Sequence, residues 1–388
     1  MVRVGYPVVM TLLPSAARSF PPDVLRTRLR RAAAEAGSRG LDALLVTPSP
    51  DFAYLLGYRP PDLERLTCLV VPASGEPRLV VPRLEAPLAR HQLGELADDV
   101  AVIPWDETDD PFALVHGLLA SDTRRVGVQD QMWARFVLRL RAVLDPVELV
   151  VASPAMSALR RTKDAEEVAR LRAAGAAADR AMEAITAERL SGRTEAEVSR
   201  RIKDLLLEAG HDTADFAIVA SGPNAASPHH EVGDRVISEG DAIVLDIGGM
   251  LDGYGSDTTR TAFVGDPPSD FAALYGVLHE AQLAACDAVA PGVPAEDIDR
   301  AARTVIAEAG YGEQFIHRTG HGIGLETHEE PYIVAGNGAP LQVGDAFSVE
   351  PGIYVDGRWG ARIEDIVVVT EGGGERLNQT DRRLYVVE

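Results

Sequence analysis

Four carboxylates interrupt segments that otherwise favour buried β-strands, and this feature constrains the fold more than any other. Asp246 lies in AIVLDIGG, Asp257 in GYGSDTTRTAFVG, Glu350 in DAFSVEPGIYV and Glu364 in ARIEDIVVVT. Strand positions of this kind usually hold Val, Ile or Thr. One such acid alone would be expected at a solvated edge or beside an arginine. Four such acids together predict two hairpins that each contribute a pair of carboxylates to one site.

Spacing limits how each pair of acids can meet. Asp246 and Asp257 share a face in two registers: directly opposite if Leu251 and Asp252 form the hairpin tip, diagonal if the tip is Asp252 and Gly253. Like charges on one buried face are costly unless a cation lies between them.

The second pair of acids, Glu350 and Glu364, depends on the length of the loop between them. A three- or five-residue loop through residues 355–358 sets these two glutamates opposite each other. A two-residue Asp356-Gly357 turn does not, unless a bulge intervenes.

A histidine-rich segment supplies a different kind of ligand. HRTGHGIGLETHEEP, residues 317–331, holds three of the nine histidines among glycines, where neither helix nor strand is favoured. Glycine lets the backbone approach a ligand closely, and neutral imidazole is a common metal ligand. His321, between two glycines, is the predicted ligand. Four carboxylates and one imidazole suit two divalent ions, with Mn²⁺, Co²⁺ and Zn²⁺ all compatible with this oxygen-rich set.

The pattern of strands and helices predicted from the sequence changes near residues 153–164. Before this point, short β-branched runs alternate with helical patterns, which is typical of an α/β domain. After it, two helices followed by a hairpin occur twice, and the first two helices open with capping-box pairs, Asp164 with Glu167 and Thr194 with Glu197. The prediction is an α/β N-terminal domain, residues 1–155, and an α+β C-terminal domain, residues 156–388.

The charge balance excludes several partners. With 38 basic and 59 acidic residues, the net charge of −21 disfavours nucleic acid and anionic membrane surfaces. No apolar run approaches the length of a membrane span. The first twenty residues weakly resemble a secretory signal peptide, but Pro7 and Pro14 interrupt the apolar run. Two distant cysteines, Cys68 and Cys286, form no metal motif and suit a reducing compartment, so a cytoplasmic protein is expected.

Five motifs in order and spacing resemble those of the pita-bread metallopeptidases, in the prolidase and aminopeptidase P branch. They are VLDIGG, GYGSDTTRT, GHGIGLETHEEP, SVEPGIY and RIEDIVVV. The resemblance covers residues from about 160 to 380, and YLLGY in the first part resembles the smaller creatinase-like domain only loosely. It implies a pita-bread (creatinase/aminopeptidase-like) catalytic domain that binds two divalent metal ions per subunit, Mn²⁺ first among them. The implied ligands are Asp246, Asp257, His321, Glu350 and Glu364, with Asp257 and Glu364 bridging.

The same resemblance implies the remaining site residues. His229, His317 and His328 match positions that bind substrate and handle protons, and His230 is one residue away from the first of these. Glu350 is implied as the proton carrier. Tyr354 and Arg362 match residues near the substrate. Arg362 also shares a strand face with Glu364, so its guanidinium can clasp a free C-terminal carboxylate or simply offset the acidic cluster.

Three functions stay open at this point. The preferred one is hydrolysis of the Xaa-Pro bond in short proline-containing peptides, as a prolidase, with release of the N-terminal residue from longer Xaa-Pro peptides, as in aminopeptidase P, as the alternative. A hydrolase of another C–N bond and a binding protein without activity are the others, although both would be expected to have lost ligands. The resemblance also implies a homodimer in which YLLGYRPPDLERL, residues 54–66, borders the partner's site.

Overall fold

The computed structural model describes residues 20–388. The signal-like segment with Pro7 and Pro14 lies outside the described residues, apart from its last residue. The first part of the chain forms a six-stranded mixed sheet in the order β4-β3-β2-β1-β5-β6. Its strands are β1 (Ala43–Val46), β2 (Cys68–Pro72), β3 (Arg78–Pro82), β4 (Ala101–Trp105), β5 (Arg125–Val128) and β6 (Glu148–Val151). These strands form the short β-branched runs predicted for this part of the chain.

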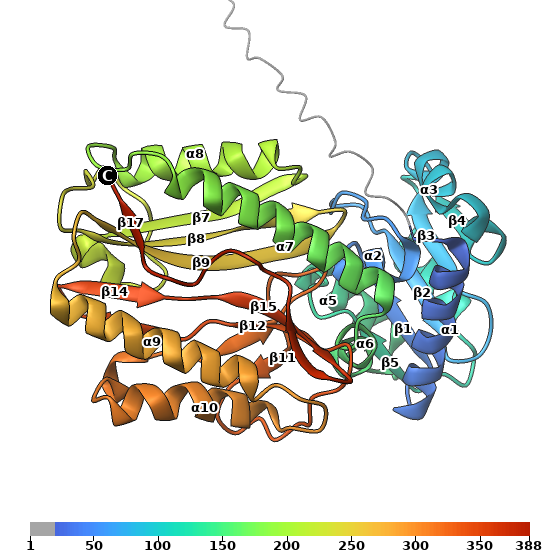
Figure 1. Ribbon diagram of the computed structural model, residues 1–388. Helices are drawn as coiled ribbons and strands as arrows, with labels where there is room; N and C mark the ends of the chain where they lie inside the picture. Colours follow the sequence, from blue (N-terminus) through green and yellow to red (C-terminus); the bar gives the residue numbers. More distant parts are fainter. Residues whose placement is uncertain (1–19) are drawn as a thin grey trace, which may run out of the picture.

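Helices surround this first sheet on the right of Figure 1. They are α1 (Pro22–Ser38), α2 (Pro50–Leu56), α3 (Ala86–Leu93), α4 (Pro111–Leu118), α5 (Ala134–Leu144) and α6 (Ser153–Arg160), with a 3₁₀ turn, η1 (Gly94–Asp98). Strand β1 is antiparallel to β2 and parallel to β5, so the sheet is mixed. Two apolar clusters fill its two sides.

The second part of the chain begins with the two predicted helices, α7 (Ala165–Thr186) and α8 (Glu195–Glu208). Both predicted capping boxes are present. The Asp164 carboxylate accepts from the Glu167 amide at 2.9 Å, and Glu197 accepts from the Thr194 amide at 2.8 Å. These helices cover a four-stranded sheet, β17-β9-β8-β7, made of β7 (Thr213–Ser221), β8 (Ala242–Leu251), β9 (Tyr254–Val264) and β17 (Tyr385–Val387). A turn, η2 (Gly222–Ala226), follows β7.

The last quarter repeats the pattern with α9 (Ser269–Asp287), α10 (Ala295–Glu308) and the turn η3 (Gly312–Gln314). A five-stranded sheet has the order β11-β10-β12-β15-β16, and β13 pairs with β14 as a separate ribbon. Their bounds are β10 (Gly320–Gly322), β11 (Glu329–Ile333), β12 (Ala346–Val349), β13 (Gly352–Val355), β14 (Trp359–Arg362), β15 (Asp365–Thr370) and β16 (Gly373–Arg376).

The two halves of this second part face each other. Figure 1 shows α7 and α8 on one outer side, α9 and α10 on the other, and the strands of both sheets between them. One apolar cluster lies under each pair of helices, so each half has its own core. The strands between the two cores carry the predicted acids.

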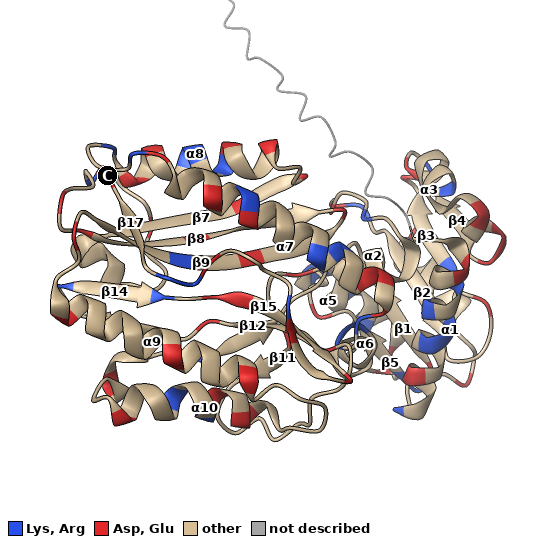
Figure 2. Cartoon of the chain, in the orientation of Figure 1, with Lys and Arg blue, Asp and Glu red and all other residues tan. Residues whose placement is uncertain are grey.

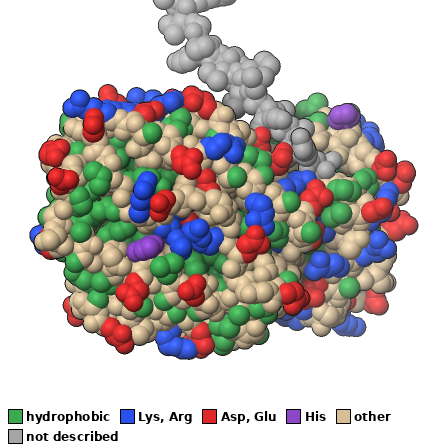
Figure 3. All heavy atoms as spheres, viewed as in Figure 1, with side chains coloured by type: hydrophobic (Ala, Val, Ile, Leu, Met, Phe, Trp, Pro, Cys, Tyr) green, Lys and Arg blue, Asp and Glu red, His purple; other side chains and the backbone are tan. Residues whose placement is uncertain are grey.

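Charged side chains cover the outside but also occur within the molecule. Figure 2 shows acidic positions on β9 and β15 as well as on the outer helices. On the face seen in Figure 3, acidic and basic side chains are interspersed among apolar ones. Among residues 20–388, no helix has both the length and the apolar character needed to cross a bilayer.

Candidate metal centre

The hairpin of β8 and β9 brings Asp246 and Asp257 onto one face. Leu251 pairs with Tyr254, so Asp252 and Gly253 form the tip, with φ angles of 49° and 80°. Two positive φ values are typical of the tight turns that join twisted strands. This is the diagonal register of the two that the sequence allowed, because Asp246 lies opposite Thr259 and Asp257 opposite Gly248.

The second pair of acids, Glu350 and Glu364, lies between two strand pairings, β12 with β15 and β13 with β14, that share one register. Val349 pairs with Asp365 on one side, and Gly352 pairs with Arg362 on the other. The connecting loop has the three residues 356–358, so the two glutamates fall opposite each other, as the three-residue alternative predicted.

The two halves are joined at the acids themselves. Thr259 of β9 forms an isolated antiparallel bridge with Glu364, which precedes β15. The Thr259 hydroxyl donates to the Glu364 carboxylate at 2.7 Å. This bridge places the second pair of acids beside the first.

His321 stands on a strand, which corrects the expectation that its glycine-rich segment would be neither helix nor strand. Gly320 and Gly322 flank it within β10, and a Cβ at Gly320 would clash with the backbone oxygen of Ser348, and one at Gly322 with that of Glu330. Glycine is needed here because neighbouring strands pack too closely for a side chain. A composition that usually signals a loop therefore marks a crowded strand.

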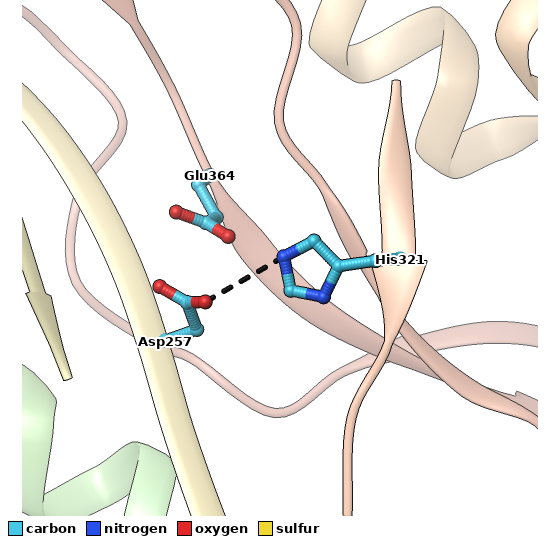
Figure 4. A group of neighbouring side chains, drawn as sticks. All are labelled: Asp257, His321 and Glu364. Atoms are coloured by element: carbon cyan, nitrogen blue, oxygen red, sulfur yellow. Dashed lines mark ion pairs between the residues drawn. The ribbon is translucent and has the colours of Figure 1, made fainter. Parts of the chain in front are cut away.

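Figure 4 shows Asp257, His321 and Glu364 pointing toward one another from three strand segments. One ligand atom from each lies within 4.8 Å of the others, and all three residues are buried. His321 Nε2 lies 3.7 Å from Asp257 Oδ2 and 3.2 Å from Glu350 Oε1. Its Nδ1 lies 3.1 Å from the Gly322 carbonyl, which can only accept, so Nδ1 carries a proton and Nε2, which faces the acids, would bind a metal in place of a proton.

Burial and like charges leave these acids poorly compensated. Burial, together with neighbouring carboxylates, raises the pKa of Asp257 and Glu364 well above the usual carboxyl range, and burial also raises the pKa of Asp246. Burial has the same tendency at Glu350, but the hydrogen bond and charge of His321 outweigh it and lower the pKa to about 2. Within residues 20–388, the buried Oδ1 of Asp246 has no hydrogen-bond partner. A dication beside each pair would remove both penalties, so the residues present fit two divalent ions.

Arg362 and Tyr354 lie beside the acids. Arg362 is 3% exposed, and its Nη2 donates to Asp246 Oδ2 at 2.7 Å. Its Nη1 donates to the Tyr354 hydroxyl at 2.8 Å, and Nε donates to the Thr259 hydroxyl at 3.1 Å. His317 Nε2 lies 3.0 Å from the same tyrosine oxygen. These contacts make a continuous polar chain from His317 to Asp246.

The predicted histidines surround this centre. The His328 ring lies 4.1 Å from that of His321, and burial, with the charges of His321 and Arg318, lowers the pKa of His328 to about 4. Burial also lowers the pKa of His317.

Of the two adjacent histidines, His230 points elsewhere. Its Nε2 is 2.7 Å from the buried carboxylate of Glu195, which also accepts from the Ser221 amide and hydroxyl. This contact engages His230 with Glu195, and the assignment of His229 to the site stays a prediction.

Two family models match the chain. Residues 169–371 match metallopeptidase family M24, and residues 28–162 match the creatinase/prolidase N-terminal domain. The chain belongs to metallopeptidase family M24. The predicted architecture, a creatinase-like α/β domain followed by a pita-bread catalytic domain, is confirmed for this M24 peptidase.

Relatives match the M24 peptidase over nearly its whole length. The probable dipeptidase PepE of Mycobacterium tuberculosis is 48% identical over 373 residues, 96% of this chain and 99% of its own. A crystal structure of dipeptidase PepE from Mycobacterium ulcerans, also 48% identical, superposes with a TM-score of 0.90 over 95% of this chain and 99% of its own. A prolidase from Thermococcus sibiricus, 37% identical, gives 0.86 over 93% and 98%.

The sequence did not identify two residues that hold the ligands of this M24 peptidase in place. Thr259 bonds both Glu364 and Arg362, and the Ser348 hydroxyl donates to Glu350 Oε1 at 3.0 Å while accepting from the His321 amide. A hydroxyl two residues from a strand acid, on the same face, is a signal that could have found both. Strand pairing alone decides what such a hydroxyl contacts.

Proposed function

We propose that this M24 peptidase is a metal-dependent dipeptidase that hydrolyses the Xaa-Pro bond, a prolidase. The observation that carries the proposal is the buried group of Asp257, His321 and Glu364, whose ligand atoms lie within 4.8 Å of one another. Relatives named dipeptidase and prolidase, matched over nearly the full chain, support this choice over aminopeptidase P.

Five residues would hold two divalent ions, with Asp257 and Glu364 in the bridging positions. The others are Asp246, His321 and Glu350. Mn²⁺ is the proposed ion, with Co²⁺ and Zn²⁺ as alternatives, because four carboxylates and one imidazole form an oxygen-rich set. When bound, the metals would lower the pKa of a water molecule toward neutrality and polarise the carbonyl of the bond to be cut.

The chain's own residues would bind and orient the peptide. His328 has a pKa of about 4 and so stays neutral at pH 7, where it can hydrogen-bond the reacting carbonyl region without carrying charge. His229, on the exposed side, would contact the substrate with it. Glu350, held by Ser348, would carry a proton at Oε1 to the leaving nitrogen.

His317, Tyr354 and Arg362 would support the substrate side of the site. Their hydrogen bonds link the imidazole of His317 through the tyrosine hydroxyl to the guanidinium. We propose that this row of hydrogen bonds fixes the orientation of Asp246, because Arg362 donates to that carboxylate directly.

A metal-reconstituted activity panel tests the proposal. Xaa-Pro dipeptides, Xaa-Pro-Yaa tripeptides and dipeptides without proline would be compared after reconstitution with Mn²⁺, Co²⁺ or Zn²⁺. We expect the Xaa-Pro dipeptides to be cleaved best. Equal cleavage of tripeptides would make aminopeptidase P the better description, and full activity without metal would exclude a metallopeptidase mechanism.

We further propose a cytoplasmic homodimer with the segment 54–66 of one subunit beside the partner's site. A loop there would restrict entry to short peptides. The proposed division into residues 1–155 and 156–388 falls within helix α6. Sedimentation of the active enzyme tests the dimer, because a monomer alone would contradict it.

A further inference from the structure

Arg318 is a half-buried cation that has no charged partner among residues 20–388. Its guanidinium lies over the ring of Tyr332, 4.4 Å from the centroid. Within residues 20–388, its side chain makes no salt bridge or hydrogen bond. Stacking on an aromatic ring orients a guanidinium while leaving its N–H groups free for a ligand.

The position of Arg318 places this free charge at the edge of the site. It directly follows His317 and lies three residues before His321, and Tyr332 belongs to β11, which pairs with the strand of His321. Tyr332 and His328 line the same cavity of about 270 Å³. The charge of Arg318 also contributes to the lowered pKa of His328. Arg318 therefore lies between two histidines of the site, beside the cavity.

Arg362, for which the sequence left open binding a substrate carboxylate or offsetting the acidic cluster, is already occupied. Each of its three guanidinium nitrogens donates to a protein oxygen, on Thr259, Tyr354 or Asp246. Moving Arg362 onto a ligand would leave the buried Asp246 carboxylate without that partner, which is costly. Arg318 can bind an anion without breaking any such contact.

We propose that Arg318 binds the free C-terminal carboxylate of the dipeptide and so determines that short substrates are preferred. The inference rests on the proposed function, since only a dipeptidase needs to recognise that carboxylate next to the scissile bond. A planar guanidinium can hold a carboxylate through two parallel hydrogen bonds. The competing explanation is a solvated arginine that touches no substrate.

The experiment compares a dipeptide with its amide on four forms of the metal-loaded full chain. Ala-Pro and its C-terminal amide would be assayed with wild type, Arg318→Ala, Arg318→Lys and Arg200→Ala. Arg200 is exposed on α8, so its loss is a matched change of charge away from the site. Arg318→Ala should lower kcat/KM for Ala-Pro roughly 30-fold, mainly through KM, and barely affect the amide. Arg318→Lys should recover part of the loss, and Arg200→Ala should match wild type.

The outcomes separate this inference from the proposed function. If wild type cleaves the amide as well as the free acid, carboxylate recognition is absent and the dipeptidase assignment fails. If wild type prefers the acid but Arg318→Ala keeps that preference, the dipeptidase assignment stands and the assignment of Arg318 is wrong. An equal loss on both substrates, with an unchanged melting temperature, also contradicts it, because a carboxylate contact acts on one of the two only.

Discussion

Two buried acidic regions lie back to back at the start of strand β15, and they differ in how their charge is balanced. Asp365 is fully buried and is neutralised by Arg260 at 2.7 Å and by Arg376 at 3.0 Å. Glu364, one residue earlier and 2% exposed, faces other carboxylates instead. Burial of an acid therefore does not mark a site by itself. A group of buried acids with too few cations does.

The largest difference between the two regions should appear in activity when one bridging acid is neutralised. Asp257→Asn removes a proposed bridging ligand, so kcat/KM should fall by about 1000-fold or more, about 4 kcal/mol. The fold should persist, because like charges around Asp257 are relieved. Activity assays, metal analysis and circular dichroism would check this. Retention of two metals and normal turnover would remove Asp257 from the centre.

The opposite result is expected for the balanced acid. Asp365→Asn leaves the fully buried Arg260 without its ionic partner, which should destabilise the protein by about 3–5 kcal/mol. Urea unfolding monitored by fluorescence measures this. If Asp257→Asn destabilises the metal-free protein as much as Asp365→Asn does, the two acidic regions do not differ in charge balance as described.

A smaller effect is expected at Thr259, which connects the two halves. Thr259→Val keeps the shape but loses the hydrogen bonds to Glu364 and Arg362, so metal affinity or activity should fall about 10–100-fold. Thr259→Ser retains the hydroxyl and is the matched control. Equal losses in both variants would mean that the methyl group, rather than the hydroxyl, matters.

The smallest effect concerns stability against pH in the metal-free protein. Because the folded-state pKa of Asp257 and Glu364 is raised, these groups favour the folded state at low pH, and that stability is lost as pH rises through the raised pKa. The melting temperature of the metal-free protein should therefore fall by a few degrees as the pH rises above the ordinary carboxyl range near 4. Mn²⁺ should weaken or abolish this trend. Parallel curves with and without Mn²⁺ would contradict it.

Much of the local structure was predictable from short stretches of sequence. Asp164 and Thr194 begin their helices as predicted, and the two acid pairs adopt registers that their spacing allowed. The prediction that the segment around His321 would form neither helix nor strand was wrong, because glycines signal a loop in most chains. Here they permit close packing against Ser348 and Glu330. Crowding of this kind is a property of neighbouring strands and leaves no local pattern.

The sequence alone determined which residues are predicted to carry the chemistry, since acids within apolar strand runs and histidine among glycines are visible without a fold. Periodicity reports the face on which a side chain lies, but not which distant element covers that face. Only the tertiary structure set Thr259 against Glu364, 105 residues away, and turned His230 onto Glu195. Only the fold engaged Arg362 with Asp246 and, within the described part of the chain, stacked Arg318 on Tyr332 without a charged partner, because the partners of a charged side chain depend on elements far apart in the chain.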